Sequence, residues 1–219
     1  MLTFEQIAKN ETIKTYIRKA DEALSVLGYT EHSLAHVTKV AHAARGILLT
    51  LGYSAREAEL AQIAGYLHDI GNVINRHDHA QSGAVMAFRI LDNVGADAED
   101  IATIIGAIGN HDEGTAVAVN PVAAALILAD KTDVRRSRVR NRDLATFDIH
   151  DRVNYAVERA YTEISEDKTA ITLNILIDTK ISAVMDYFEI FLARMLLCRK
   201  AAEMLKLKFR LVINDQIVL

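Results

Sequence analysis

Hydrophobic residues recur every three to four positions through the first two-thirds of the chain, a spacing that predicts a succession of amphipathic helices. One helix is expected to end at Gly52, and its apolar stripe consists of Val37, Val40, Ala44, Ile47, Leu48 and Leu51. Residues Ser54 to Glu57 form a capping box that predicts the start of the next helix, and Gly71 is expected to stop it. Further helices are predicted over residues 79–91, 98–108 and 121–133.

Near residue 150 the period of the pattern changes from 3.6 to 2, which predicts strands instead of helices. The alternating apolar positions of the first such strand are Ile171, Leu173, Ile175 and Ile177. The stretch before a turn at Ser165–Lys168 is its expected hairpin partner. A helix over 182–204 and a strand over 205–213 should complete the tail. We therefore predict a mainly α protein, with a helical bundle over residues 1–148 and a small α+β subdomain over 149–219.

Composition excludes several classes of protein. About half of the 219 residues are apolar, enough for a sizeable core, and the net charge of −4 argues against an extended nucleic-acid surface. Cys198 is the only cysteine, which excludes an intrachain disulfide and a cysteine-based zinc site, and favours a reducing, cytoplasmic setting. No stretch approaches the length of apolar sequence that a membrane span needs, and the N-terminus has no secretion signal pattern.

Several ionisable residues fall on, or at the end of, the apolar faces of the predicted helices. They are His36, His68, Asp69, His79, His111 and Asp130. A single histidine on such a face is more often a hydrogen-bonded core residue, and a single aspartate at a helix end is usually a cap. Burying two ionised aspartates costs several kcal/mol or more, however, and a divalent cation is the simplest way to offset that cost. Together the residues favour a metal site.

The order and spacing of these residues fit a known pattern. The segments that carry it are His36–Ala41, Leu51–Ser54, Tyr66–Gly71, His79–Gly83, Asn110–Glu113 and Ile127–Lys131. With them, roughly residues 30–142 resemble the HD-domain superfamily of metal-dependent phosphohydrolases. The resemblance implies an HD-type helical bundle in which His36, His68, Asp69 and Asp130 bind one metal, and His79 and His111 are the extra ligands of members that hold two.

The resemblance also implies the chemistry. Mixed imidazole and carboxylate ligands suit Mn, Fe, Co, Ni or Zn, and two such ions per chain, bridged by Asp69, would activate a water molecule to cleave a phosphate ester. We therefore predict catalytic roles for Asp69, His79 and His111. If a single metal binds, His79 and His111 become substrate contacts or acid–base residues. The chain departs from members that cleave cyclic dinucleotides, because Gly114-Thr115-Ala116 replaces their Gly-Tyr-Pro motif, and Asn72 replaces a lysine that many members have.

Residues expected to contact substrate lie beside these ligands. Lys131, Arg135 and Arg136 open a basic cluster next to Asp130; such clusters are usually solvated, but an arginine fork here would clamp a phosphate. His32, one helical turn before His36, is expected to contact substrate, to reach a second metal or only to form a hydrogen bond nearby.

The expected substrate is a nucleotide or another small phosphorylated metabolite. Two other functions remain open, a di-iron oxygenase and a non-catalytic nucleotide or metal sensor. The apolar helix near Phe188, Phe191, Leu192, Met195 and Leu196 is a candidate homodimer surface.

Overall fold

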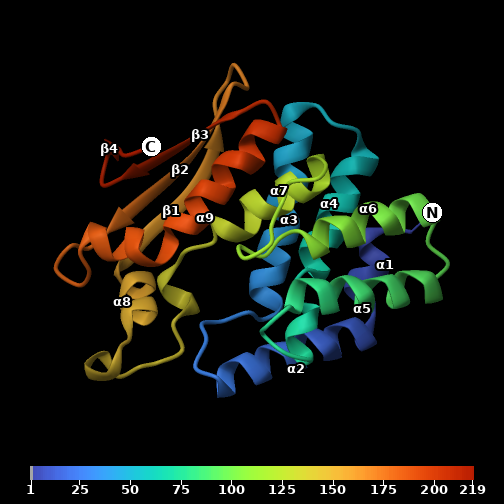
Figure 1. Ribbon diagram of the computed structural model, residues 1–219, viewed down its shortest axis with the longest axis horizontal. Coiled ribbons are helices and arrows are strands. Elements are labelled where there is room, and N and C mark those ends of the chain that lie inside the picture. Colours follow the sequence, from blue (N-terminus) through green and yellow to red (C-terminus); the bar gives the residue numbers. More distant parts are fainter. Residues whose placement is uncertain (1) are drawn as a thin grey trace.

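The computed structural model describes residues 2–219 as a helical bundle against which a small sheet and its covering helix pack (Figure 1). The bundle contains α1 (Phe4–Lys9), α2 (Glu11–Val26), α3 (Leu34–Leu51), α4 (Ala55–Leu67), α5 (His79–Asn93), α6 (Ala98–Gly109) and α7 (Pro121–Lys131). The tail contains α8 (Ile149–Ala156), β1 (Val157–Ile164), β2 (Ala170–Ile177), α9 (Val184–Met204), β3 (Lys208–Ile213) and β4 (Gln216–Ile217). The mainly α fold predicted from the sequence is confirmed.

Local signals in the sequence place the ends of α3 and α4 correctly. Gly52 follows α3 in the left-handed conformation, with φ of 91°, and its amide bonds to carbonyl oxygens of the last turn. Ser54 and Glu57 form the expected capping box at the start of α4, each side chain accepting a hydrogen bond from the other residue's backbone amide. The two helices therefore pack as an antiparallel pair joined by a short turn.

The role predicted for Gly71 was wrong. Helix α4 already ends at Leu67, and Gly71 lies inside a 3-10 turn, Ile70–Val73, that follows the His68-Asp69 pair. A Cβ atom at Gly71 would lie 2.0 Å from the carbonyl oxygen of His79 and 2.5 Å from the amide nitrogen of Gly83. Glycine is needed because the turn touches the backbone of α5, a contact between segments that the local pattern does not reveal.

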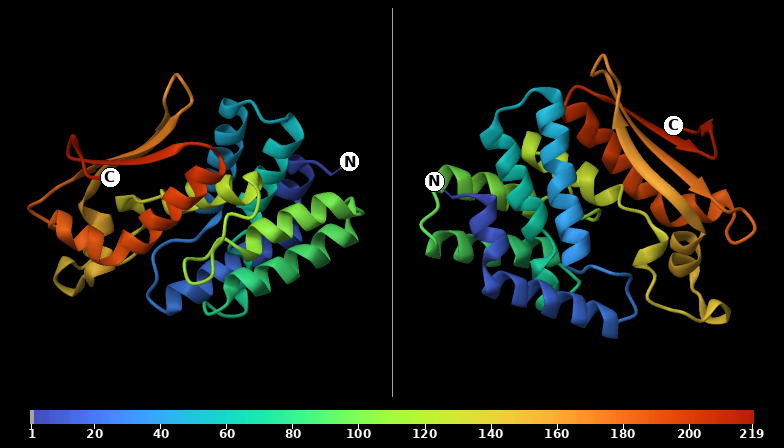
Figure 2. Two further views of the ribbon diagram at one scale, coloured as in Figure 1. Left: turned by 45° about the horizontal axis from the view of Figure 1, so that its top comes forward. Right: turned by 180° about the vertical axis from the view of Figure 1, so that it is seen from behind.

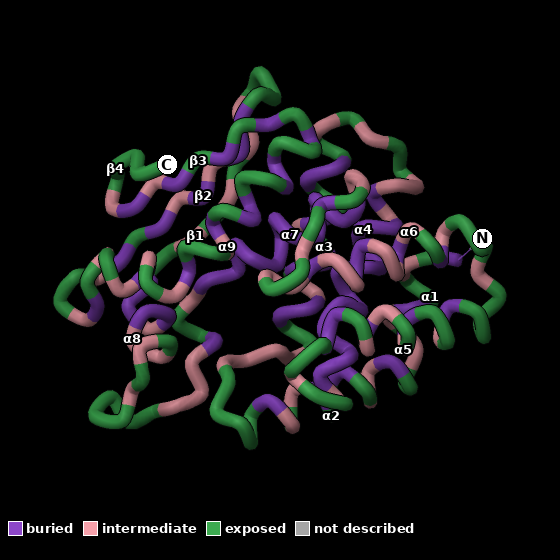
Figure 3. The backbone as a smooth tube through the Cα atoms, viewed as in Figure 1, coloured by how far each residue is buried: buried purple, intermediate pink, exposed green. Residues whose placement is uncertain are grey.

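Helix α7 is the centre of the molecule. Every residue from Val122 to Lys131 is buried, and the helix packs against α3, α4, α6 and α9. Figure 3 shows this concentration of buried residues along α7 and its neighbours. The predicted helix ran two residues too far, to position 133, because Thr132 bonds through its hydroxyl to the carbonyl oxygen of Leu128 and ends the last turn.

The tail forms a four-stranded sheet in the order β1-β2-β3-β4. The predicted hairpin is present, since β1 and β2 pair antiparallel, and α9 then crosses over so that β3 pairs parallel with β2 (Figure 2). Two details differ from the sequence prediction. Helix α8 was not expected, and the strand predicted from residue 205 begins at Lys208, because Lys206 adopts a left-handed turn with φ of 61°.

Helix α9 lies between β3 and α7 and so joins the two parts of the molecule. Phe191 and Met195, two of the residues considered for a dimer surface, are buried inside the chain, whereas Leu192 and Leu196 are exposed. Among residues 2–219, none of the helices combines the length and apolar character that crossing a membrane requires.

The close approach at Gly71 leads to a stability prediction. We expect Gly71→Ala to lower the free energy of unfolding by about 1–3 kcal/mol or more, because the methyl group overlaps the backbone of α5. Gly46→Ala is the control: it lies in α3 with open space around its Cα, and alanine should stabilise that helix by roughly 0.5–1 kcal/mol. Urea unfolding of both variants measures the difference, and equal stabilities would contradict this account of Gly71.

Candidate metal centre

The residues predicted as metal ligands come from separate helices and meet at one buried point. His36 lies in the first turn of α3, His68 and Asp69 follow α4, His79 begins α5, His111 follows α6, and Asp130 lies in the last turn of α7. All six are buried, with His36 and His68 fully inaccessible and Asp130 the most accessible at 8%. The helix ends thus direct imidazoles and carboxylates into a common core.

Four of these residues form a first group. The Nε2 atom of His36 lies 3.3 Å from Asp130 Oδ1 and 3.7 Å from Asp69 Oδ2. The Nε2 atom of His68 lies 3.3 Å from Asp69 Oδ2 and 3.6 Å from Asp130 Oδ1. Within the described part of the chain, neither Nε2 atom makes a hydrogen bond, although both are buried. Two buried nitrogens without partners, facing two carboxylates, have the donor pattern of a cation site.

The other ring nitrogen of each histidine is fixed by a hydrogen bond. His36 Nδ1 donates to Asp133 Oδ2 at 2.8 Å. The Nδ1 atoms of His68, His79 and His111 each bond to the carbonyl oxygen three residues earlier, at 2.8, 3.1 and 2.6 Å. Such bonds orient the ring and place the lone pair on Nε2, as they do around histidine ligands in metalloproteins.

A second group shares Asp69 with the first. His79 Nε2 lies 3.2 Å from His111 Nε2 and 3.6 Å from Asp69 Oδ1, the oxygen that faces away from His36 and His68. Asn72 holds this Oδ1 atom with a 2.9 Å hydrogen bond. His32 Nδ1 lies 2.7 Å from Asp69 Oδ2, so His32 borders the first group. Asp69 Oδ2 thus faces His32, His36 and His68, whereas Asp69 Oδ1 faces His79.

The electrostatics of the site demand positive charge. Burial opposes ionisation of Asp130, but Lys131 and His68 outweigh it and hold the pKa of that carboxyl well below its usual range. Burial likewise opposes a charge on His68, yet Asp69 and Asp130 raise its pKa to about 10. When no metal is bound, the two carboxylates therefore favour the protonated, positively charged form of His68. A divalent cation bound here would supply that positive charge in place of the proton.

The second group has the protonation state that metal ligands need. Burial, helped by the charges of His68 and Lys131, lowers the pKa of His111 well below its ordinary value, so this imidazole is neutral. Burial is also the main cause that lowers the pKa of His79. Two neutral imidazoles whose Nε2 atoms lie 3.2 Å apart, beside the carboxylate of Asp69, fit a divalent transition metal.

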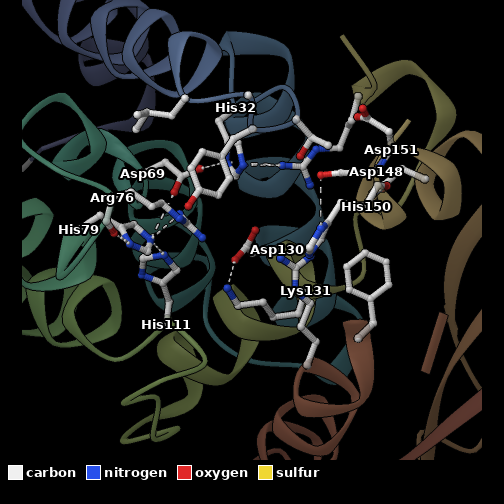
Figure 4. Close-up of a pocket in the computed structure, with 18 residues that line it drawn as sticks. His32, Asp69, Arg76, His79, His111, Asp130, Lys131, Asp148, His150 and Asp151 are labelled. Carbon is white, nitrogen blue, oxygen red and sulfur yellow. Dashed lines mark hydrogen bonds and ion pairs between the residues drawn. The ribbon is translucent and has the colours of Figure 1, made fainter. Parts of the chain in front are cut away.

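A cavity of about 490 Å³ opens onto these groups (Figure 4). His32, Asp69, His79, His111, Asp130 and Lys131 form its inner wall, and Figure 4 shows His79 and His111 pointing toward one another. Arg76, Arg138 and Arg194 also line it. The outer wall includes residues of the tail, among them His150 and Asn154 of α8 and Phe191 of α9. The cavity thus lies between the bundle and the tail.

The residues predicted as substrate contacts separate into two sets. Lys131 and His32 line the cavity, and Lys131 Nζ lies 2.8 Å from Asp130 Oδ2. Arg135 and Arg136 are absent from the described residues that line it. Arg135 makes ion pairs with Glu31 and Asp133, and Arg136 donates to the carbonyl oxygen of Tyr155 and lies over that residue's ring.

Other residues of the site were missed in the sequence. Asp133 orients His36, and its position three residues after Asp130, nearly one helical turn, was an available signal. Asn72 was noted only as a departure from a family motif, yet it orients Asp69. Arg194 lies more than sixty residues after Asp130 in the chain and gives no local signal; it reaches the site through an ion pair with Glu113, whose Oε1 atom lies 2.6 Å from Arg194 Nε.

Comparison with known proteins agrees with the geometry. The family model for the HD domain matches residues 33–189. A protein of Methanocaldococcus jannaschii named "Uncharacterized protein MJ1020" is 26% identical over 203 residues, covering 82% of this chain and 77% of that protein. The matched segment contains the six predicted metal ligands, from His36 to Asp130, and begins one residue after His32. This chain belongs to the HD-domain family, a superfamily of metal-dependent phosphohydrolase type.

Proposed function

We propose that the protein is a metal-dependent phosphohydrolase that cleaves a phosphate ester of a nucleotide or another small phosphorylated metabolite. The observation that supports this most strongly is the pair of buried, unpartnered Nε2 atoms of His36 and His68 facing the carboxylates of Asp69 and Asp130. Membership of the HD-domain family points to the same reaction class. In the reaction, a water oxygen bonds to phosphorus, the ester P–O bond breaks, and the leaving oxygen takes a proton.

We assign two metal positions. His36, His68, Asp130 and one oxygen of Asp69 would hold the first ion, and His79, His111 and the other oxygen of Asp69 the second. When bound, such a pair supplies an activated water nucleophile and neutralises charge on the phosphoryl oxygens. Asp69, His79 and His111 are therefore the proposed catalytic residues.

The cavity supports a small, anionic substrate. Its volume is within the range of about 300–1,000 Å³ that is typical of small-molecule sites. Lys131 and three arginines line it close to the metal ligands, and the side chains of Asp148, His150, Asp151 and Asn154 line the part that the tail contributes. We propose that the phosphate binds beside Lys131 and these arginines, and that the remainder of a nucleotide-sized substrate lies against the tail. A homodimer through the exposed face of α9 remains a proposal.

The second candidate is a di-iron oxygenase, because histidines and a shared carboxylate are also the ligands that such centres use. Lys131 and the three arginines in the cavity wall favour the hydrolase, since a phosphate needs such charges.

The first prediction concerns metal binding. We expect His68→Ala and Asp69→Ala each to lose bound metal and activity together, because both residues contribute atoms to the proposed first position. Elemental analysis of the purified variants measures this. His77→Ala is the control, since the His77 side chain is 86% exposed, and it should keep its metal. Full occupancy in Asp69→Ala would refute the assignment.

The second prediction concerns the number of metals. Gentle purification should give close to two metal ions per chain, and His111→Ala should keep about one while losing most turnover, because half of the two-metal site is removed. The ratio of metal to protein, measured with several metals, tests this. One ion per chain in the wild type, whichever metal is supplied, would contradict it and leave His79 and His111 as proton-transfer or substrate residues.

The third prediction separates the two reactions. Phosphate release should continue unchanged under strict anaerobiosis, with no oxygen uptake in air, when a panel of nucleotides and phosphate esters is tested with each metal. An oxygen electrode and a phosphate assay on the same samples measure both. Turnover that depends strictly on dioxygen would establish the oxygenase instead.

A further inference from the structure

The guanidinium of Arg138 is held rigidly at the wall of the cavity. Arg138 ends the 3-10 turn Arg136–Arg138 and is only 4% exposed. Its Nε atom donates to the carbonyl oxygen of Glu31 at 2.9 Å, and Nη1 donates to the carbonyl oxygen of Asp133 at 2.9 Å. The amide of Glu31 in turn donates to the Arg138 carbonyl oxygen at 2.8 Å. Two backbone segments thus fix the orientation of the guanidinium.

The third nitrogen of this guanidinium has no strong acceptor. Among the described residues, Nη2 approaches only the ring nitrogens of His32, at 3.4 and 3.5 Å, which is longer than an ordinary hydrogen bond. His32 Nδ1 is already engaged with Asp69 Oδ2 at 2.7 Å. Because Arg138 lines the same cavity as Asp69 and Asp130, Nη2 is available to a molecule that enters it.

The charge of Arg138 is also incompletely balanced. The nearest carboxylate oxygen is Asp133 Oδ2, 3.9 Å from Nη1, and Asp133 is shared with His36, Lys39 and Arg135. Asp130 and Asp69 act on Arg138 from further away, and a divalent cation would take up their negative charge. A buried guanidinium that loses its counter-charges in this way favours an anion beside it.

We infer that Arg138 is a catalytic residue that donates a hydrogen bond from Nη2 to a free oxygen of the substrate's phosphate group. This inference rests on the proposed phosphohydrolase function and deepens it by naming the phosphate-binding arginine. A donor that is fixed in place before substrate arrives is effective because little reorganisation accompanies the charge that develops on the phosphoryl oxygens. Arg138 thus takes the phosphate-binding role that the sequence suggested for Arg135 or Arg136.

The test compares Arg138→Lys and Arg138→Ala with Arg142→Ala, which removes the same charge from an exposed position four residues away. Each protein is loaded with metal, its metal content is verified, and binding of inorganic phosphate is measured by calorimetry beside KM and kcat. We expect Arg138→Lys to weaken phosphate binding about tenfold to a hundredfold at unchanged metal content. Arg142→Ala should change it less than about twofold. Added guanidinium ion should restore part of the phosphate binding of Arg138→Ala.

The outcomes separate this inference from the proposed function. A wild-type protein that holds metal but neither binds phosphate nor hydrolyses any ester would refute the proposed function. A wild type that does both, with an Arg138→Lys variant of equal phosphate affinity and KM, would overturn the role of Arg138 alone. Equal losses in Arg138→Ala and Arg142→Ala would also overturn it, because both variants remove one positive charge and a diffuse field would then explain the binding.

A further measurement does not depend on how the variants fold. A crystal structure of the wild type with metal and inorganic phosphate should place a phosphate oxygen within about 3.2 Å of Nη2. A phosphate bound at the metal ligands but out of reach of Arg138 would overturn the inference.

Discussion

The burial of two ionised carboxylates, Asp69 and Asp130, is the constraint on which the rest of the structure depends. Such groups are stable inside a protein only with positive charge and hydrogen bonds close by. Four histidines therefore converge on them from four helix ends, and Lys131 pairs directly with Asp130. Helix α7, buried from Val122 to Lys131, can carry Asp130 into the core because the imidazoles of its neighbouring helices meet the carboxylate there.

The same requirement extends outward to the tail. Lys131 is itself buried and pairs with Glu113 at 3.3 Å, and Glu113 pairs with Arg194 on α9. This chain of alternating charges runs from a proposed metal ligand to the helix that covers the sheet. The tail is therefore tied electrostatically to the metal centre, and its helices form the outer wall of the cavity. A substitution of Arg194 in α9 would therefore alter the electrostatic environment of Asp130, although α9 contains none of the proposed metal ligands.

Fixed geometry is the second theme of the site. Each ligand histidine has its Nδ1 atom bonded, Asn72 holds Asp69, and two backbone carbonyls hold Arg138. Groups held in this way keep their lone pairs and N–H bonds directed at the cavity before a ligand binds. That preorganisation is what a hydrolase needs to stabilise charge that appears only in the transition state. The same hydrogen bonds explain how so many polar side chains can be buried in this region.

Sequence alone determined helices α3 to α7 and α9, the hairpin and the convergence of six ligand candidates, because hydrophobic periodicity records which face of each element is buried and the motif records their order. Only the tertiary structure decided which arginine of the basic cluster after Asp130 reaches the cavity: the 3-10 turn after α7 directs Arg138 inward and leaves Arg135 and Arg136 in other contacts. It likewise revealed why Gly71 is glycine and how Arg194 joins the site. Those features depend on contacts between segments far apart in the chain, and periodicity within one element carries no information about its partner.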